Sequence, residues 1–217
     1  MRLISALTIV AGLLMPSLAQ ANLITNGDFT SCSGCGGAFA TKPGGSTDVS
    51  GWLVTGTSVD VILSYWQAPP LGGNSIDLNG STGDPGNRAG GVSQSFATVA
   101  GQSYLVNFYL SGNPDNNNVD SLKSAVVSAV ADSSTYTFDT SGISKSNMGW
   151  VLESFVFSAI SSTSTLSFAG VNQDDFYGAA IGNVSVSETP EPGTLMMMGF
   201  GMLALFGYGV ARARRHA

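Results

Sequence analysis

The sequence predicts an all-β domain, a two-sheet β-sandwich of about eight strands with jelly-roll topology. Short segments of alternating apolar and polar residues recur between clusters of Gly, Pro, Asn and Asp, as expected for strands joined by turns. No segment of the central chain has a convincing apolar period of 3.6, so helices are not expected there. An immunoglobulin-like sandwich is disfavoured, because the chain lacks a distant cysteine pair flanking a tryptophan.

The individual strands follow from the alternation. In residues 104–110 the apolar side chains can share one face while Asn107 turns away. Residues 150–157 are apolar on both faces, which predicts a central strand. Residues 122–130 could be mistaken for a helix, but alternate apolar residues and serines favour a strand. The remaining expected strands cover 58–63, 74–78, 91–98, 163–168 and 180–186.

The first twenty-one residues are typical of a secretory signal peptide. Arg2 supplies a positive start, residues 3–15 are apolar, and Ala19-Gln20-Ala21 is a small-x-small cleavage site. We therefore expect the mature chain to begin at Asn22, outside the cytoplasm. The folded domain is then expected to span residues 22–187, the length of one domain.

Residues 188–217 combine three features in order at the C-terminus. These are a Pro-Glu-Pro element, an uncharged run over 194–210 and a basic end, formed by Pro190, Glu191, Pro192, Arg212, Arg214 and Arg215. An apolar run of this length followed by arginines predicts a transmembrane helix with its C-terminus in the cytoplasm. A core helix is disfavoured, since the run has no polar face and contains four glycines.

This tail resembles the PEP-CTERM sorting signal, which is found on exported proteins of Gram-negative bacteria that secrete an exopolysaccharide. The resemblance implies processing by an exosortase and delivery to the cell surface or extracellular matrix, after transient anchoring in the inner membrane. An ordinary single-pass tail is the alternative.

The charge balance excludes nucleic acid as a partner. Four basic and fourteen acidic residues lie between Asp28 and Glu191, a net charge of 4 − 14 = −10. Such a surface repels phosphate backbones. Neutral glycans, cations or proteins are the expected partners.

Cys32 and Cys35 are the only cysteines. In an exported chain they are expected to form a local disulfide that pins a turn. Thioredoxin-like chemistry is disfavoured because no helix follows to lower a thiol pKa, and zinc would need two further ligands. The single histidine, His216, lies in the predicted cytoplasmic tail.

A series of short motifs appears in the order seen in choice-of-anchor C proteins. They lie at residues 22–29, 51–52, 59–62, 65–67, 75–80, 94–98, 101–104, 112–113 and 148–150. These proteins resemble the DUF642 group, whose domains are similar to galactose-binding-like carbohydrate-binding modules. The resemblance covers the whole of residues 22–187 and implies binding of a wall or matrix polysaccharide.

Sugar sites of such modules combine an aromatic platform with polar groups for the hydroxyls. The segment Tyr65-Trp66-Gln67, in a loop before two prolines, is the expected platform, with Arg88 as an added polar contact. The alternatives are that Trp66 packs under its loop and that the Arg88 loop is a solvated turn. Trp52 and Trp150 are expected in the core.

The resemblance also implies one structural calcium, for which Asp28 is the candidate ligand. Thr30 and Gly182 depart from the acidic residues common at that site, which weakens it.

Catalysis is not expected. Without a histidine in the domain, triads of the Ser-His-Asp and Cys-His types are impossible. Asp174, Asp175 and Glu153 are the only carboxyl groups considered for a glycosidase pair. Besides a glycosidase, two functions remain open: a sugar-binding domain and a structural surface protein that contacts other proteins. Exposure of Trp66 in a concave patch would distinguish them.

Overall fold

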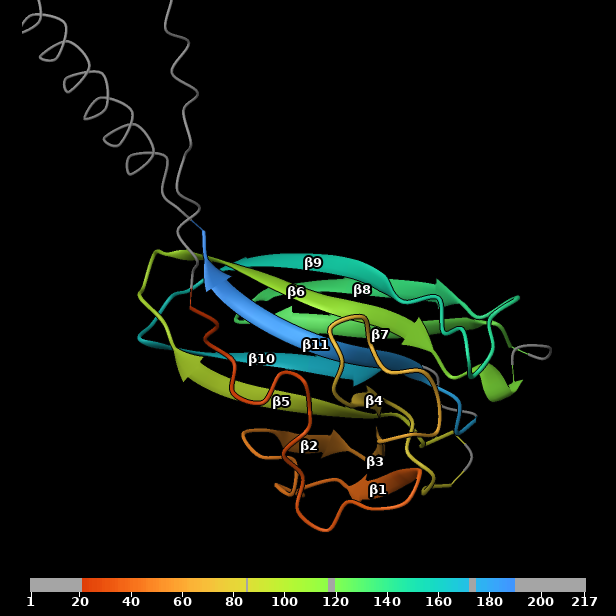
Figure 1. The fold of residues 1–217 in the computed structure, drawn as a ribbon. Helices are drawn as coiled ribbons and strands as arrows, with labels where there is room; N and C mark the ends of the chain where they lie inside the picture. The colour runs from red at the N-terminus through yellow and green to blue at the C-terminus, as the bar shows by residue number, and fades with distance from the viewer. Residues whose placement is uncertain (1–20, 85, 117–119, 172–174, 190–217) are drawn as a thin grey trace, which may run out of the picture.

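The domain is a sandwich of two antiparallel sheets, as predicted. The structure, a computed structural model, describes residues 21–84, 86–116, 120–171 and 175–189 (Figure 1). In spatial order, the six-stranded sheet contains β1 (Phe39–Pro43), β3 (Ser58–Ile62), β4 (Ser75–Asp77), β11 (Ala179–Glu188), β6 (Ser103–Gly112) and β9 (Val151–Ser158). The five-stranded sheet contains β2 (Leu53–Gly56), β5 (Gly90–Ala97), β10 (Thr163–Gly170), β7 (Leu122–Ala129) and β8 (Asp132–Asp139). A short 3-10 turn, η1 (Pro114–Asn116), follows β6.

Aromatic side chains fill the space between the sheets. Phe108 of β6 contacts Phe168 of β10 edge to face, with ring centroids 5.1 Å apart. Trp52 also packs against Phe168 and donates its indole N–H to the backbone oxygen of Asn26 at 3.1 Å. The shared apolar face predicted for residues 104–110 is buried, which confirms the alternation there.

All eight expected strands are present, within two residues at each end. Three more strands, β1, β2 and β8, were not expected. Each of the three lies at an edge of its sheet, and the outer positions of β8 are serine, threonine and aspartate. Edge strands of this kind carry little apolar alternation, so the periodicity could not find them.

The prediction that residues 150–157 form a central strand was wrong. β9 is the last strand of the six-stranded sheet and pairs only with β6 among the described strands. Its outward-facing Leu152 and Val156 are exposed rather than covered. A side chain of the other sheet contacts β9 instead: the Tyr136 hydroxyl of β8 donates to the backbone oxygen of Ser154 at 2.5 Å.

A second, smaller apolar cluster lies on the outer face of the six-stranded sheet. Two loops fold over this face: the β3–β4 loop, which Figure 1 shows crossing β11, and the β8–β9 loop. They enclose Ile62, Trp66, Met148 and Ala180, with Tyr65 and Trp150 packed against them. Because of this outer cluster, part of the outer sheet face is covered by packed loops and is not flat.

A bulge in β11 holds the β3–β4 loop in place. Asn183 has a φ of 48°. Its side-chain amide donates to the backbone oxygen of Gly72 at 2.8 Å, and its side-chain oxygen accepts from the Leu71 N–H at 3.1 Å. The loop is therefore attached to the sheet by hydrogen bonds at its far end as well as by Trp66.

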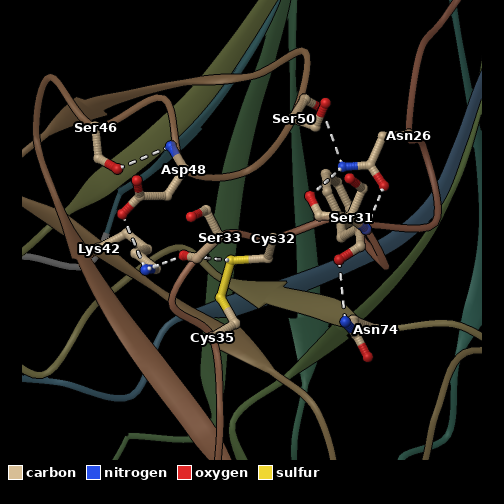
Figure 2. The surroundings of a disulfide bond; sticks show 11 residues. Asn26, Ser31, Cys32, Ser33, Cys35, Lys42, Ser46, Asp48, Ser50 and Asn74 are labelled. Carbon is tan, nitrogen blue, oxygen red and sulfur yellow. Dashed lines mark hydrogen bonds and ion pairs between the residues drawn. A yellow bond between two sulfur atoms is a disulfide. The ribbon is translucent and has the colours of Figure 1, made fainter.

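Cys32 and Cys35 are joined by a disulfide in the turn before β1 (Figure 2). The same turn is held by other contacts. Ser33 donates its N–H to the backbone oxygen of Asp48 at 2.8 Å. The nearly buried Lys42 ammonium lies 2.9 Å from the Asp48 carboxylate and donates to the Ser33 oxygen at 2.8 Å.

Replacing both Cys32 and Cys35 by serine is expected to lower the melting temperature by only a few degrees. Closing so short a loop is worth about 2 kcal/mol or less, and the Lys42 and backbone contacts remain. Differential scanning calorimetry of the parent under oxidising conditions and of the double variant measures the shift. Loss of cooperative unfolding in the variant would contradict this account.

Candidate pocket on the outer sheet face

A recessed pocket with a volume of about 150 Å³ opens beside the outer apolar cluster. Side chains from three strands and four connecting segments line it: Phe39, Asp60, Ile62, Tyr65, Trp66, Asp77, Ser81, Asn113, Asp115, Phe176 and Tyr177. Five of these are aromatic and three are aspartates. Aromatic rings beside a few oriented oxygen groups are the composition of a site for a small polar ligand.

Strand register places two of the aspartates together. Asp60 of β3 lies directly opposite Asp77 of β4. Their neighbours Val61 and Ile76 point into the core, so both aspartates point to the outer face. Asp60 accepts hydrogen bonds from Ser81, at 2.6 Å from its hydroxyl and 3.2 Å from its N–H.

Asp77 is fully buried at the base of this pocket. Its carboxyl group accepts from the N–H groups of Asn79 and Gly178, each at 3.0 Å, and from the Asn113 amide at 2.8 Å. Burial raises the pKa of Asp77 to about 8, with a smaller contribution from the Asp60 charge, although the three N–H donors oppose this shift. The base of the pocket therefore carries a largely uncharged carboxyl group at neutral pH.

A cluster of three side chains joins three loops at the rim. The Tyr65 hydroxyl donates to Asp115 at 2.5 Å, and the Lys145 ammonium lies 2.9 Å from the other oxygen of the same carboxylate. The ammonium also lies over the Tyr65 ring, 3.8 Å from its centroid. Partial burial lowers the pKa of Lys145, but its bonds to Tyr65 and Asp115 outweigh burial and raise that pKa overall.

The segment that precedes β11 also lines the pocket, through Phe176 and Tyr177. The Arg88 guanidinium lies over the Phe176 ring, 3.7 Å from its centroid. Asp175 lies beside this ring, accepts from the Tyr177 N–H and pairs with the buried Lys123 at 3.1 Å. A buried ion pair therefore fixes the segment that carries Phe176 and Tyr177.

The expectation that Trp66 is an exposed platform was wrong. Trp66 is only 6 % exposed, and its indole N–H donates to the Ser75 hydroxyl at 2.9 Å. The loop folds back onto the sheet, so the ring forms part of the pocket wall and fills the outer cluster. Packing under the loop, the alternative considered above, is what occurs. Tyr65, by contrast, lies at the rim.

Gln67 does not line the pocket. Its side-chain oxygen accepts from the Met148 N–H at 2.9 Å, and its backbone oxygen accepts from the Trp150 indole at 3.2 Å. It therefore links the β3–β4 and β8–β9 loops. The Arg88 guanidinium contacts the site through the Phe176 ring. Trp52 is in the core as expected, but Trp150 is not: it is only partly buried and packs against the outer cluster.

Several pocket residues were missed from the sequence. From the sequence, Asp60 and Asp77 are expected only as strand residues, and Asp115 is not singled out. The available signal was an aspartate at an alternating position in two strands with otherwise apolar neighbours. Phe39, Phe176 and Tyr177 carry no such signal, because only the fold brings them together.

The residues present do not fit the calcium site that the resemblance implied. Asp28 is exposed, and its carboxylate accepts from the hydroxyl of Thr30 at 3.0 Å. A side chain at Gly182 would meet the Pro69 ring, since an added Cβ would lie 2.3 Å from the Pro69 Cγ. Within the described residues, no group of three or more His, Cys, Asp or Glu side chains is arranged to hold a metal ion.

Several expected features lie outside the described part of the chain. They are the signal peptide, Asp174 and the sorting residues Pro190, Glu191, Pro192, Arg212, Arg214 and Arg215. In the part that is described, no helix is long and apolar enough to span a membrane. Glu153, the other carboxyl group considered for catalysis, lies on the edge strand β9.

Fold and pocket together define an all-β sandwich domain with a recessed aromatic and acidic site. The chain belongs to the family described as "Protein of unknown function (DUF642)", whose model matches residues 22–187. The PEP-CTERM protein-sorting motif matches residues 188–215. This motif implies exosortase-sorted export to the cell surface or extracellular space. Both matches confirm the resemblances noted above.

One curated relative is halomucin of Haloquadratum walsbyi, 32% identical over 181 residues. That match covers 81% of this chain but only 2% of halomucin.

Several solved structures are similar to this chain at low sequence identity. The Stig cyclase Fisc from Fischerella sp. TAU has a TM-score of 0.52 at 12% identity, covering 78% of this chain and 97% of the cyclase. A structure described as "CBM4 structure and function" has a TM-score of 0.44 at 15% identity, covering 76% of this chain and 99% of the chain in that structure. Tailspike protein 4 of bacteriophage CBA120 has a TM-score of 0.46 at 19% identity, covering 77% of this chain and 21% of the tailspike.

Proposed function

We propose that this protein is a surface or matrix protein that binds a sugar unit of an extracellular polysaccharide in the pocket, without catalysis. The observation that carries the proposal is the pocket lining, which places the apolar surfaces of Phe39, Tyr65 and Tyr177 beside the oxygen groups of Asp60 and Asp115. Pyranose rings offer this same combination, an apolar face and a rim of hydroxyls. The volume of about 150 Å³ suits one sugar unit rather than a long groove.

The charges favour a neutral sugar. Lys145 neutralises Asp115, and Asp77 is largely protonated at neutral pH. Lys42 and Lys123 are buried in ion pairs within the fold. With an excess of acidic groups over the domain, a polyanion gains little from this surface.

The arrangement of β11 supports presentation of the pocket away from the membrane. Phe176 and Tyr177 precede the first residue of β11, whereas the sorting motif begins at its last residue, Glu188. The ten residues of β11 separate these points by about 33 Å, at the usual rise per residue of a β-strand. In this proposal the C-terminal run anchors the protein transiently in the inner membrane until an exosortase processes it.

Replacing Phe39 by alanine is expected to weaken glycan binding by about 1–3 kcal/mol, that is about 5- to 150-fold in Kd, with little change in stability. The ring is 38 % exposed on an edge strand, so its loss removes ligand contact rather than core packing. A glycan array identifies the ligand of the purified domain, and calorimetric titration measures the variant.

Leu122→Ala is the matched control, because Leu122 is also exposed on a strand but does not line the pocket. Equal affinities of Phe39→Ala, Leu122→Ala and the parent would contradict the assignment of the site. An array with no glycan bound would favour the alternative of a structural surface protein that contacts other proteins.

Changing Pro190-Glu191-Pro192 to three alanines is expected to block maturation in the native host. The apolar run and its arginines are intact in this variant, so membrane insertion persists while the recognition element is lost. Immunoblots of membrane and extracellular fractions should show the longer form accumulating in the membrane. Release identical to the parent would show that the tail is a plain anchor.

A further inference from the structure

The end of the sandwich at which β11 finishes carries exposed apolar side chains on three turns. Val99 in the β5–β6 turn is 62% exposed, Val130 in the β7–β8 turn is 40% exposed, and Ile160 in the β9–β10 turn is 76% exposed. The first and third turns are directly joined, since the Gly101 N–H donates to the Ala159 oxygen at 2.7 Å. These three residues are called the apolar tips below.

The last described residue is fixed to the same end. The N–H and hydroxyl of Thr189 donate to the Ser103 oxygen at 2.9 and 3.0 Å. The Gln102 side chain donates to the Thr189 oxygen at 2.8 Å, and the Gln102 N–H bonds to the Val99 oxygen at 3.0 Å. The point from which the sorting tail leaves is therefore held by the turn that carries Val99, and Figure 1 shows both ends of the described chain at this end of the sandwich.

The tail is too short to hold the domain far from a membrane. Residues 190–193 separate Thr189 from the uncharged run that begins at Thr194. Four residues span about 14 Å at full extension. The headgroup region of one leaflet is itself roughly 5–7 Å thick, so a run inserted in the bilayer keeps this end of the domain at the headgroups.

We propose that the apolar tips contact the lipid surface while the chain is anchored, so that the domain stands on this end with its pocket directed outward. This proposal rests on the anchoring proposed above. The chemistry of the contact is apolar: Asp132 and Glu188 are the exposed charged residues beside these turns. Arg88, Lys123 and Lys145 lie at the far ends of β5, β7 and β9. Anionic lipids therefore do not strengthen the contact. Three aliphatic side chains bind a lipid surface only weakly by themselves, but the inserted C-terminal run keeps them at a high effective concentration near that surface.

Tryptophan fluorescence with brominated lipid tests this orientation on the full chain. Ile160→Trp and Val99→Trp variants are reconstituted in vesicles of phosphatidylcholine, either plain or brominated near the top of one acyl chain, and the parent signal is subtracted. Val171→Trp is the matched control, because Val171 is 45% exposed and follows the other end of β10, about 26 Å away. Bromine quenches indole only at close range.

We expect brominated vesicles to lower the fluorescence of Ile160→Trp and Val99→Trp and to leave Val171→Trp unchanged. Co-sedimentation with vesicles separates the two proposals. A chain that sediments but shows no quenching at residues 99 and 160, or equal quenching at residue 171, would overturn the docked orientation and leave the anchor standing. A chain that stays in solution would overturn both.

Discussion

Replacing Trp66 by alanine is expected to lower the free energy of unfolding by about 3–5 kcal/mol. The ring is buried between the β3–β4 loop and the sheet, where it packs with Ile62, Met148 and Ala180. Its removal leaves a cavity beneath the loop and deprives the Ser75 hydroxyl of its indole partner. Chemical denaturation of parent and variant at the same pH measures the change.

Trp66→Phe separates packing from hydrogen bonding. The phenyl ring retains most of the buried surface and loses only the indole N–H bond, worth about 1 kcal/mol. Phe39→Ala, which removes an exposed ring from the same pocket, should leave stability nearly unchanged. If Trp66→Ala unfolds like the parent and loses glycan binding alone, the ring contacts ligand and is not part of the outer cluster.

The stability of the domain is expected to fall as the pH rises from about 4 to about 8, because of Asp77. In the folded state this carboxyl group keeps its proton up to a pKa of about 8, whereas in the unfolded chain it has the ordinary aspartate pKa of 3.8. Between these values the folded chain binds more protons, so the free energy of unfolding decreases with pH, by at most about 1.4 kcal/mol per unit.

Asp77→Asn removes the titration while keeping the size of the side chain. Its unfolding free energy should change less between pH 4.5 and 8 than that of the parent, a range set by the pKa values of Asp77. Hydrogen bonds lower the pKa values of Asp48 and Asp139, so the stability they contribute is lost only as the pH falls below about 4, outside this range. Identical slopes in parent and variant would show that Asp77 is ionised in the fold.

Local patterns predicted the sandwich well because successive residues of a strand point to opposite faces of the sheet, so apolar residues on the core side alternate with polar residues on the solvent side. Residues 122–130 illustrate this, since alternation there correctly excluded a helix. The position of a strand in its sheet is a non-local property, and β9 shows the difference: two apolar faces suggested a central strand, yet its outer face is exposed at an edge.

The candidate site was predicted only in part, for a related reason. Of the 65–67 segment, Tyr65 lies at the rim of the pocket and Trp66 in its wall, whereas Gln67 links two loops outside it. That division depends on which side of the loop meets the sheet, which the contacts to Ser75 of β4 and Asn183 of β11 determine. The pairing of Asp60 with Asp77 likewise depends on strand register.

The most direct test of glycan recognition is to locate a bound oligosaccharide by amide chemical shifts. The domain is labelled with nitrogen-15 and titrated with the best ligand from the array. We expect shifts concentrated at the pocket, in the amides of Phe39, Tyr65, Asp115 and Tyr177, with the amides of Leu122 and Ile160 unchanged. Saturable shifts confined to another face, or binding with no change at the pocket amides, would contradict it.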